Sequence, residues 1–432
     1  MKVIYLTAGA AGMYCGSCMH DNSLARAMIA EGVDTLLVPT YTPIRTDEMD
    51  VSVDKVFFGG VNIYLQQLAP WLKYTPRWLD QFLNSPKLIR WVASRGMETS
   101  PKQLGALTVS MLRGKQGNQR KEVDRLCDWL AREIKPDALV LTNMLIAGFV
   151  PDLKKSLKVP VAVTLQGDDI FLDYLPEPYR QQTIDVMQQL VGGIDAFIAH
   201  SRDYGQRMAT VLNIPPGKLH IMPLAIDTTP FHQQADANRS MPEAPTVGYM
   251  ARLAPEKGLH LLVDAFVKLH EDQAMRSTRL RIAGWLGPSN QDYWEKQKQK
   301  IAAAGLSEFV SYEGEIDHRH KVDFMHGVDV LCVPTTYRDP KGLFVLEALA
   351  SGTPVIVPAH GAFPEMLQRL GGGWLVSPDD VDSITEKLRW IFTNREEAAR
   401  LGREAWPAVL RHADIRSMAQ QTIALLKNLQ NT

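Results

Sequence analysis

Two carboxylates stand on either side of a glycine in the stretch RDPKGLFVLEALASGTP, residues 338–354. Asp339 precedes Gly342, and Glu347 lies eight positions after Asp339 in an apolar, alanine-rich run that predicts a helix. The first N–H groups of a helix are unpaired and carry a partial positive charge, so an entrance at a glycine suits a phosphate. The hydroxyl groups of a sugar would need carboxylate acceptors. The spacing therefore predicts a site for a nucleotide attached to a sugar.

A pair of cations lies in GYMARLAPEKG, residues 248–258, where Arg252 and Lys257 are five positions apart after a predicted strand. A guanidinium and an ammonium in such a loop can clamp a diphosphate and offset the charge that builds on it as it leaves. Taken alone, the spacing is better explained by a solvated loop with an ion pair between Arg252 and Glu256.

A second glycine-rich segment, GAAGMYCGSC at residues 9–18, lies where the first strand should turn into a helix. Gly9, Gly12 and Gly16 would let the backbone approach a diphosphate or a sugar. The segment does not match GxGxxG, and no acid stands at the distance expected for a ribose contact. An NAD enzyme is therefore disfavoured.

The same segment contains Cys15 and Cys18, and His20 follows them. Two cysteines and a histidine could indicate a redox or metal site. The other cysteines, Cys127 and Cys332, lie far away in the sequence, so a pair of small thiols in a tight loop is favoured. We predict no metal site.

Two further acids, Asp168 and Asp169, follow the predicted strand in VTLQGDDIF, residues 163–171. They could guide the proton of an acceptor hydroxyl, or they could cap the helix that follows. The sequence favours neither interpretation.

A basic stretch at residues 73–121 contains ten Lys or Arg residues and two acids. Aromatic and apolar side chains are interleaved at its start, namely Trp71, Trp78, Leu79, Phe82, Leu83 and Trp91. This composition, over residues 71–121, is typical of interfacial helices that contact anionic lipid and would place the protein peripherally at the inner face of a membrane. A solvated helical insertion whose tryptophans pack on their own domain fits slightly better.

The elements that must position these residues are strands alternating with helices. At 432 residues the chain is long for one core, and two domains are expected. Short β-rich runs such as KVIYLTA, PVAVTLQG, TVGYMARL and TPVIVPA alternate with helical patterns, which is typical of βαβ units on a parallel sheet. The polar residues 231–245 interrupt this alternation and predict a linker. We therefore expect an α/β protein with two Rossmann-like domains, 1–231 and 245–406, whose parallel sheets face across a cleft, and a C-terminal helix at about 407–432 that packs back on the first domain.

The composition excludes several classes of protein. The formal net charge of -1 gives no reason to expect nucleic acid as a partner. The apolar run that opens the chain ends at glycines and is too short for a signal peptide or a membrane span. Four cysteines are too few for a disulfide framework, so a cytoplasmic location is expected.

Several motifs together resemble a known family. ARLAPEKG is followed by RIAGWLG, by YEGEI, by the two acids at Asp339 and Glu347, and by SGTPVIVPAHGAFPE. In order and spacing these motifs resemble the donor half of the retaining GT-B glycosyltransferases of family GT4 over roughly residues 245–380, and the first half fits more loosely. The resemblance implies transfer of a sugar, with a hexosyl group expected, from a nucleotide-diphosphate sugar to an acceptor hydroxyl held mainly by the first half. The acceptor would be a carbohydrate, a lipid-linked molecule or a small molecule, and no cofactor or metal is expected.

The resemblance also implies roles for individual residues. Arg252 and Lys257 would hold the donor diphosphate, and backbone N–H groups at the helix entrance would contact the phosphate and the sugar. The entrance residues are Gly342, Leu343 and Phe344.

The two acids would contact different parts of the donor. Glu347 would accept hydrogen bonds from the ribose hydroxyls, and Asp339 would lie beside the transferred sugar. The usual first acid is glutamate, so the shorter aspartate is a departure from the family. The remaining donor-binding residues would be Gly12, Gly314 and Glu315, the last two lining the nucleobase pocket. Gln166 stands where family members commonly have a histidine.

Two other functions use the same kind of pocket. A sugar-nucleotide epimerase or hydrolase of this fold would act on the donor without an acceptor, and a noncatalytic sugar-nucleotide-binding protein would release no nucleoside diphosphate.

Overall fold

The computed structural model describes residues 1–9, 16–44, 46, 48–53, 57, 101–232 and 241–431. The chain divides into two compact units. Unit 1 comprises Met1–His200, Tyr204–Met222 and Ala419–Thr432, and unit 2 comprises Ser201–Asp203 and Pro223–Met418.

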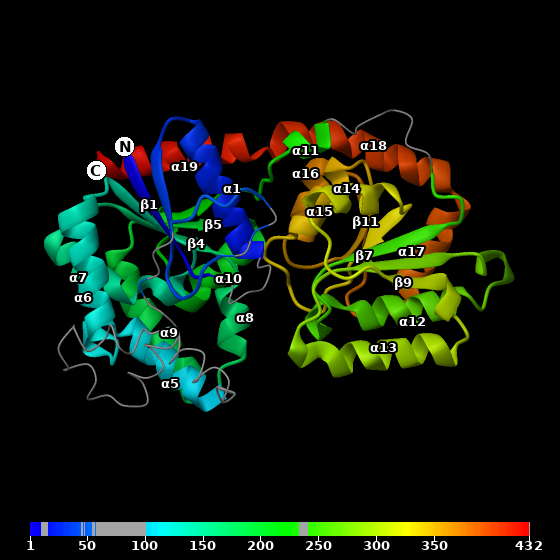
Figure 1. The fold of residues 1–432 in the computed structure, drawn as a ribbon, viewed down its shortest axis with the longest axis horizontal. Coiled ribbons are helices and arrows are strands. Elements are labelled where there is room, and N and C mark those ends of the chain that lie inside the picture. The colour runs from blue at the N-terminus through cyan, green and yellow to red at the C-terminus, as the bar shows by residue number, and fades with distance from the viewer. Residues whose placement is uncertain are drawn as a thin grey trace. The chain divides into compact units, whose positions relative to one another are not determined.

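Unit 1 is built on a six-stranded sheet with the order β2-β1-β3-β4-β5-β6, in which every pairing is parallel (Figure 1). Its strands are β1 Lys2–Thr7, β2 Asp34–Pro39, β3 Ala138–Leu141, β4 Val161–Leu165, β5 Ala196–Ala199 and β6 Leu219–Ile221. The central strands β3, β4 and β5 are buried along their whole length, as expected for a parallel sheet covered on both faces.

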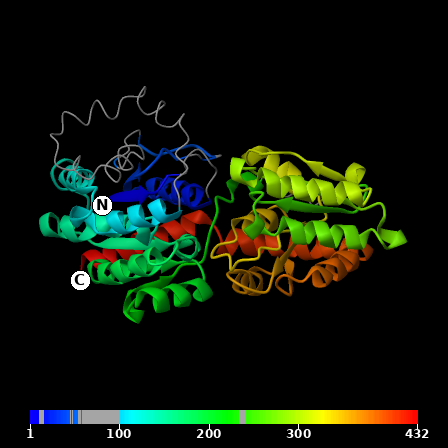
Figure 2. The ribbon, with the colours of Figure 1, turned by 90° about the horizontal axis from the view of Figure 1, so that it is seen from below.

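Helices flank this sheet on both faces (Figure 2). They are α1 Gly16–Ala30, α5 Pro101–Leu112, α6 Arg120–Asp128, α7 Val150–Ser156, α8 Asp168–Asp173, α9 Tyr179–Leu190, α10 Arg202–Leu212 and α19 Ile415–Gln430.

Unit 2 repeats the architecture with a second parallel sheet of six strands in the order β12-β11-β10-β7-β8-β9. Its strands are β7 Thr246–Met250, β8 Arg279–Ala283, β9 Val310–Tyr312, β10 Val330–Cys332, β11 Val355–Pro358 and β12 Gly373–Val376. The strand order reverses between β7 and β10, and ligands of open α/β sheets bind outside the carboxyl ends of the strands at such a point.

The helices of unit 2 also lie on both faces of its sheet (Figure 2). They are α11 Thr229–His232, α12 Leu259–Leu269, α13 Gln291–Ala303, α14 His318–His326, α15 Leu343–Ala350, α16 Phe363–Leu370, α17 Val381–Thr393 and α18 Arg395–His412.

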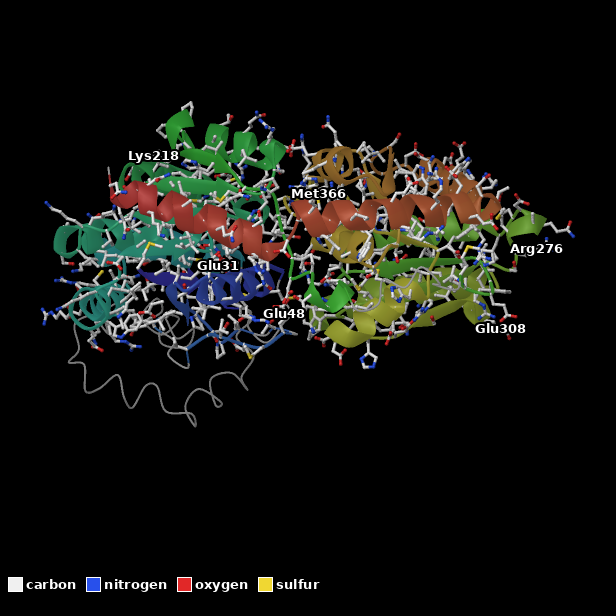
Figure 3. All side chains as sticks on the ribbon, turned by 90° about the horizontal axis from the view of Figure 1, so that it is seen from above. Glu31, Glu48, Lys218, Arg276, Glu308 and Met366 are labelled. Atoms are coloured by element: carbon white, nitrogen blue, oxygen red, sulfur yellow. The ribbon has the colours of Figure 1, made fainter. Side chains whose placement is uncertain are left out.

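The last helix, α19, returns to unit 1. Gln420 donates to Glu31 Oε2 at 3.0 Å, and Figure 3 shows Glu31 beside this helix. Near its end, Gln430 Nε2 donates to the carbonyl of Asp137 at 2.8 Å. The chain therefore begins in unit 1, passes through unit 2 and ends on unit 1.

The two Rossmann-like sheets confirm the predicted α/β class. Strands form in each of the β-rich runs that the sequence pattern indicated, and β2 and β6 add two that it did not. Of the predicted linker, residues 233–240 lie outside the described residues, and β7 begins at Thr246 directly after it. No helix in the described part of the chain is both long and apolar enough to cross a membrane.

Candidate functional site

The loop that carries Arg252 and Lys257 leaves β7 at the point where the strand order of unit 2 reverses. The hydroxyl of buried Tyr249 lies 3.1 Å from the carbonyl oxygen of Arg252 and 3.4 Å from that of Lys257, so it holds both ends of the loop. Gly258 ends the loop with φ +74°, and a Cβ there would lie 1.7 Å from the carbonyl oxygen of Pro334. Only glycine allows the loops after β7 and β10 to approach this closely.

Three side chains from these two loops form a partly buried cluster. Lys257 Nζ donates to the Tyr337 hydroxyl at 2.5 Å and to Asp339 Oδ2 at 2.8 Å. The Tyr337 hydroxyl in turn donates to Asp339 Oδ2 at 2.8 Å. The Lys257 and Asp339 side chains are only 14% and 5% exposed, so this ion pair is largely shielded from solvent. The structure thus brings together the predicted residues Lys257 and Asp339 and adds Tyr337, which the sequence analysis missed.

Asp339 also organises the entrance of α15. Its Oδ1 accepts the backbone N–H groups of Lys341 at 3.0 Å and Gly342 at 3.1 Å. Burial by itself would raise the pKa of Asp339, but the charge of Lys257 and these hydrogen bonds outweigh burial and hold the pKa well below its usual value. The carboxylate therefore remains ionised and joins the lysine to the helix entrance.

The helix entrance has the geometry that a close ligand would need. Gly342 is the N-cap of α15 with φ +69°, and a Cβ there would lie 2.8 Å from the Phe363 ring. Its own N–H is used by Asp339, so Leu343 and Phe344 supply the first N–H groups of the helix. Phe344 is buried with its ring 5.7 Å from that of Phe363, so its contribution to a ligand would come from the backbone.

Arg252, the second predicted cation, is paired with Glu256 through a 3.1 Å contact between Nη2 and Oε1. This is the ion pair that the sequence offered as the alternative explanation of the motif. The Arg252 side chain is 41% exposed, and an exposed pair of this kind holds its members weakly. Arg252 is therefore held only weakly by Glu256.

Glu347 projects from the second turn of α15 and is almost buried. Its Oε1 accepts from Lys321 Nζ of α14 at 2.9 Å, with side chains that are 12% and 9% exposed. Lys321 is a second residue that sequence reasoning missed, because it belongs to no motif and lies 26 positions before Glu347.

The residues predicted to line a nucleobase pocket lie at the carboxyl end of β9, two strands from β7 in the sheet. Gly314 has φ +72°, and its carbonyl accepts the N–H of Gly284 at 2.8 Å. Glu315 is exposed. The hydrogen bond from Gly284 joins this segment to the loop after β8.

In unit 1, Asp168 and Asp169 begin α8 after Gly167. Asp168 Oδ1 accepts the N–H of Met144 at 2.7 Å, and its Oδ2 accepts the N–H of Gln166 at 3.2 Å. Burial raises the pKa of this carboxyl to about 6, although the two backbone donors act in the opposite direction. Asp169 pairs with Arg207 at 2.9 Å. Asp168 therefore holds the backbone after β3 to the backbone after β4. It does not cap α8 as the second interpretation expected, because the N-cap of this helix is Gly167 and no side chain makes a capping hydrogen bond there.

Asp168 is expected to make the protein less stable as the pH rises from about 4 to about 6. Because folding raises its pKa from 3.8 to about 6, the folded protein retains in this window a proton that the unfolded chain has released. The stabilisation is therefore complete below about pH 4 and is lost, by about 3 kcal/mol, as the pH rises through 6. Urea unfolding at several pH values should show the stability of the wild type falling relative to that of Asp168→Asn across this window. A constant difference between the two proteins would contradict the raised pKa.

Asp21 of α1 is a fully buried carboxylate that the sequence patterns did not single out. Its Oδ1 accepts from the Tyr5 hydroxyl at 2.8 Å and from Gln166 Nε2 at 2.9 Å. Its Oδ2 accepts from the hydroxyls of Thr7 at 2.7 Å and Thr142 at 2.5 Å. Asp21 therefore connects β1 with the segments that follow β3 and β4.

Gln166 is also part of this network. It stands at the position where family members commonly have a histidine. Its amide nitrogen also lies 3.1 Å from Thr142 Oγ1 and 3.2 Å from the Thr142 carbonyl. His20 Nδ1 lies 3.7 Å from Asp21 Oδ1. Burial would raise the pKa of Asp21, but the nearby His20, with the two threonine hydroxyls, lowers it overall.

Some predicted features lie outside the described residues, namely Gly12, Cys15 and the basic stretch before residue 101. Cys18 is buried, and the Thr7 hydroxyl lies 3.8 Å from its sulfur. Within the described ranges, no group of three or more His, Cys, Asp or Glu side chains is arranged to hold a metal ion.

Comparison with known proteins places the chain in a family. Residues 231–406 match the model described as glycosyl transferases group 1, and residues 22–225 match the glycosyl transferase 4-like domain. The MMP alpha-(1->4)-mannosyltransferase of Mycolicibacterium hassiacum is 25% identical over 243 residues, which are 56% of this chain and 56% of that protein. A D-inositol 3-phosphate glycosyltransferase of Mycobacterium marinum is 26% identical over 76% of this chain and 67% of its own length. The chain thus spans about half the length of the first curated relatives it matches.

Solved structures share the fold at low sequence identity. The sucrose-phosphate synthase of Thermosynechococcus elongatus has a TM-score of 0.72 and 18% identity, with 99% of each chain covered. Anabaena HepE, solved in complex with UDP, has a TM-score of 0.69 and 16% identity over 99% of this chain and 100% of its own. The two family models between them match most of the chain and agree with the motifs and the fold. The chain therefore belongs to the group 1 glycosyl transferases of family GT4 and has the GT-B fold.

Proposed function

We propose that this protein is a glycosyltransferase that moves a sugar from a nucleotide-diphosphate sugar to an acceptor hydroxyl, with retention of the anomeric configuration and without a metal ion. One observation carries the proposal. The largely shielded ammonium of Lys257 is held by Asp339 beside the entrance of α15 at Gly342, where the strand order of unit 2 reverses. Membership of the family and the sugar nucleotides held by structural neighbours support it, since HepE was solved with UDP and with UDP-glucose. Retention, and a hexosyl group as the one transferred, rest on the family resemblance.

The chemistry needs charge stabilisation more than it needs a nucleophile. When the bond between the anomeric carbon and the diphosphate oxygen breaks, negative charge collects on the departing diphosphate. Lys257 and Arg252 can offset that charge, and the first N–H groups of α15 add their partial positive charge. A preorganised ammonium and a helix terminus supply what a divalent cation would otherwise supply, which motivates the metal-independent mechanism.

A donor screen tests the proposal. UDP-, GDP- and ADP-sugars should be compared for their ability to raise the melting temperature, since a ligand that binds only the folded state stabilises it by mass action. The donor so selected should then release nucleoside diphosphate in the presence of acceptor candidates, with activity retained in excess EDTA. Turnover of the donor without any acceptor would favour an epimerase or hydrolase, and binding without release would favour a noncatalytic sugar-nucleotide-binding protein.

Glu347→Gln is expected to weaken the binding of free nucleoside diphosphate by about tenfold or more. The substitution removes a charged acceptor for the ribose hydroxyls, and such a hydrogen bond contributes roughly 1.5 to 3 kcal/mol. Isothermal titration calorimetry with the selected nucleoside diphosphate measures the effect. Glu386→Gln in α17 of the same unit is the matched control. Equal affinities for wild type and Glu347→Gln would remove Glu347 from the ribose site.

Contact with an anionic membrane through residues 71–121 remains a prediction. In the described part of this stretch, Lys115 and Arg120 both lie near Asp124, at 2.6 and 3.8 Å. Ion pairs of this kind are typical of a solvated helical surface. They agree with the alternative interpretation of this stretch as a solvated helical insertion.

A further inference from the structure

The cluster of Lys257, Tyr337 and Asp339 contains a residue for which the motifs assign no role. The Tyr337 side chain is partly buried, and its hydroxyl accepts from Lys257 and donates to Asp339. Nζ lies 4.8 Å from the ring centroid, a distance that follows from this hydroxyl contact. Tyr337 therefore contacts Lys257 through its hydroxyl.

A lysine needs such support to act as a fixed charge. Its ammonium is a point charge on a flexible four-carbon stem, and that flexibility must be given up when the charge is held in one place. In this structure two of the three N–H groups point to Tyr337 and Asp339, which leaves the ammonium one further donor. Both partners come from the loop after β10, so the loop that leads into α15 also sets where the ammonium lies.

We propose that Tyr337 is a positioning residue that acts through Lys257, aiming its remaining N–H at the donor diphosphate, with Asp339 as the second member of the same support. The inference rests on the proposed function. It differs from the role that the resemblance implies for Asp339, since both oxygens of this carboxylate are engaged by the lysine, the tyrosine and the helix entrance.

Tyr337 is suited to this role because its hydroxyl keeps its proton. Burial, followed by the neighbouring charge of Asp339, raises the pKa of Tyr337 well above its ordinary value. A neutral hydroxyl can accept from the ammonium and donate to the carboxylate at once, whereas a phenolate could only accept.

Tyr337→Phe provides the test because it keeps the ring and deletes the hydroxyl. We expect about tenfold weaker binding of the nucleoside diphosphate that the donor screen selects, a similar loss in kcat/KM for the intact donor, and little change in melting temperature. Tyr293→Phe is the matched control, since it deletes a hydroxyl of the same unit that is bonded to His260 and not to a member of this cluster. Equal diphosphate affinity in Tyr337→Phe and the wild type would overturn the inference.

A double-mutant cycle on diphosphate affinity separates positioning from general structural support. If Tyr337 acts through Lys257, adding Tyr337→Phe to Lys257→Ala should cause no further loss. An additional loss in that background as large as in the wild type would also overturn the inference. A wild-type protein that binds diphosphate but transfers no sugar would count against the proposed function alone, and one that binds none of UDP, GDP and ADP would overturn both.

Discussion

Replacing Lys257 with alanine is expected to lower turnover by about two orders of magnitude or more. The ammonium is largely buried and held by Tyr337 and Asp339, so it is preorganised where the charge of the leaving diphosphate would develop. Removing one preorganised group of this kind costs roughly 100- to 1000-fold in kcat in other enzymes. Steady-state rates with the donor selected by the screen measure the loss. The control is Lys268→Ala, which removes an exposed lysine paired with Asp382 in the same unit and should leave the rate unchanged.

The same substitution leaves the buried carboxylate of Asp339 without its cation, which is expected to destabilise unit 2. The double variant Lys257→Ala, Asp339→Asn removes both charges and should regain most of the lost stability without regaining turnover. Melting temperatures measured beside the rates therefore separate a folding defect from a loss of chemistry. Near-wild-type rates in Lys257→Ala would remove the lysine from the proposed mechanism.

Asp21→Asn is expected to lower the free energy of unfolding by about 3 kcal/mol. The carboxylate is fully buried and accepts hydrogen bonds from Tyr5, Thr7, Thr142 and Gln166. An amide of the same shape offers one oxygen and places an NH₂ group against donors, so buried donors lose their acceptor. Breaking a buried charged network of this kind costs roughly 3 to 5 kcal/mol.

Urea denaturation at neutral pH measures this effect, and Asp34→Asn on β2 of the same unit is the control because its side chain is 62% exposed. The lowered pKa of Asp21 also fixes the direction of the pH dependence. A carboxyl whose pKa falls on folding stabilises the protein above its unfolded pKa and loses that contribution as the pH falls through the folded pKa. The advantage of the wild type over Asp21→Asn should therefore shrink in acid. A loss below about 1 kcal/mol at neutral pH would show that the network is not a major source of stability.

The fold class could be predicted because it depends on patterns that are local in the sequence. The strands of a parallel sheet buried on both faces are short continuous apolar runs, and they alternate with helical patterns along the chain. A strand with a weak local pattern is missed for the same reason. β6 is an example, because it is three residues long and only half-buried. The motifs of the second half could also be recognised, since their order and spacing do not depend on where they lie in space.

By itself, then, the sequence determined the α/β class, most of the strands, the family and which residue types could bind a sugar nucleotide. It could not determine which of these residues touch, because contact depends on strand order. Lys257 and Asp339 are 82 positions apart and meet only because β10 pairs with β7, which brings the loops after both strands together. Asp21 likewise accepts from Thr142, 121 positions away, because β3 lies beside β1. Only the tertiary structure decided that Asp339 accepts from Lys257 and that Asp21 accepts from donors on three segments of unit 1. The physical reason is that the sequence around a carboxylate does not record which donors folding will place beside it.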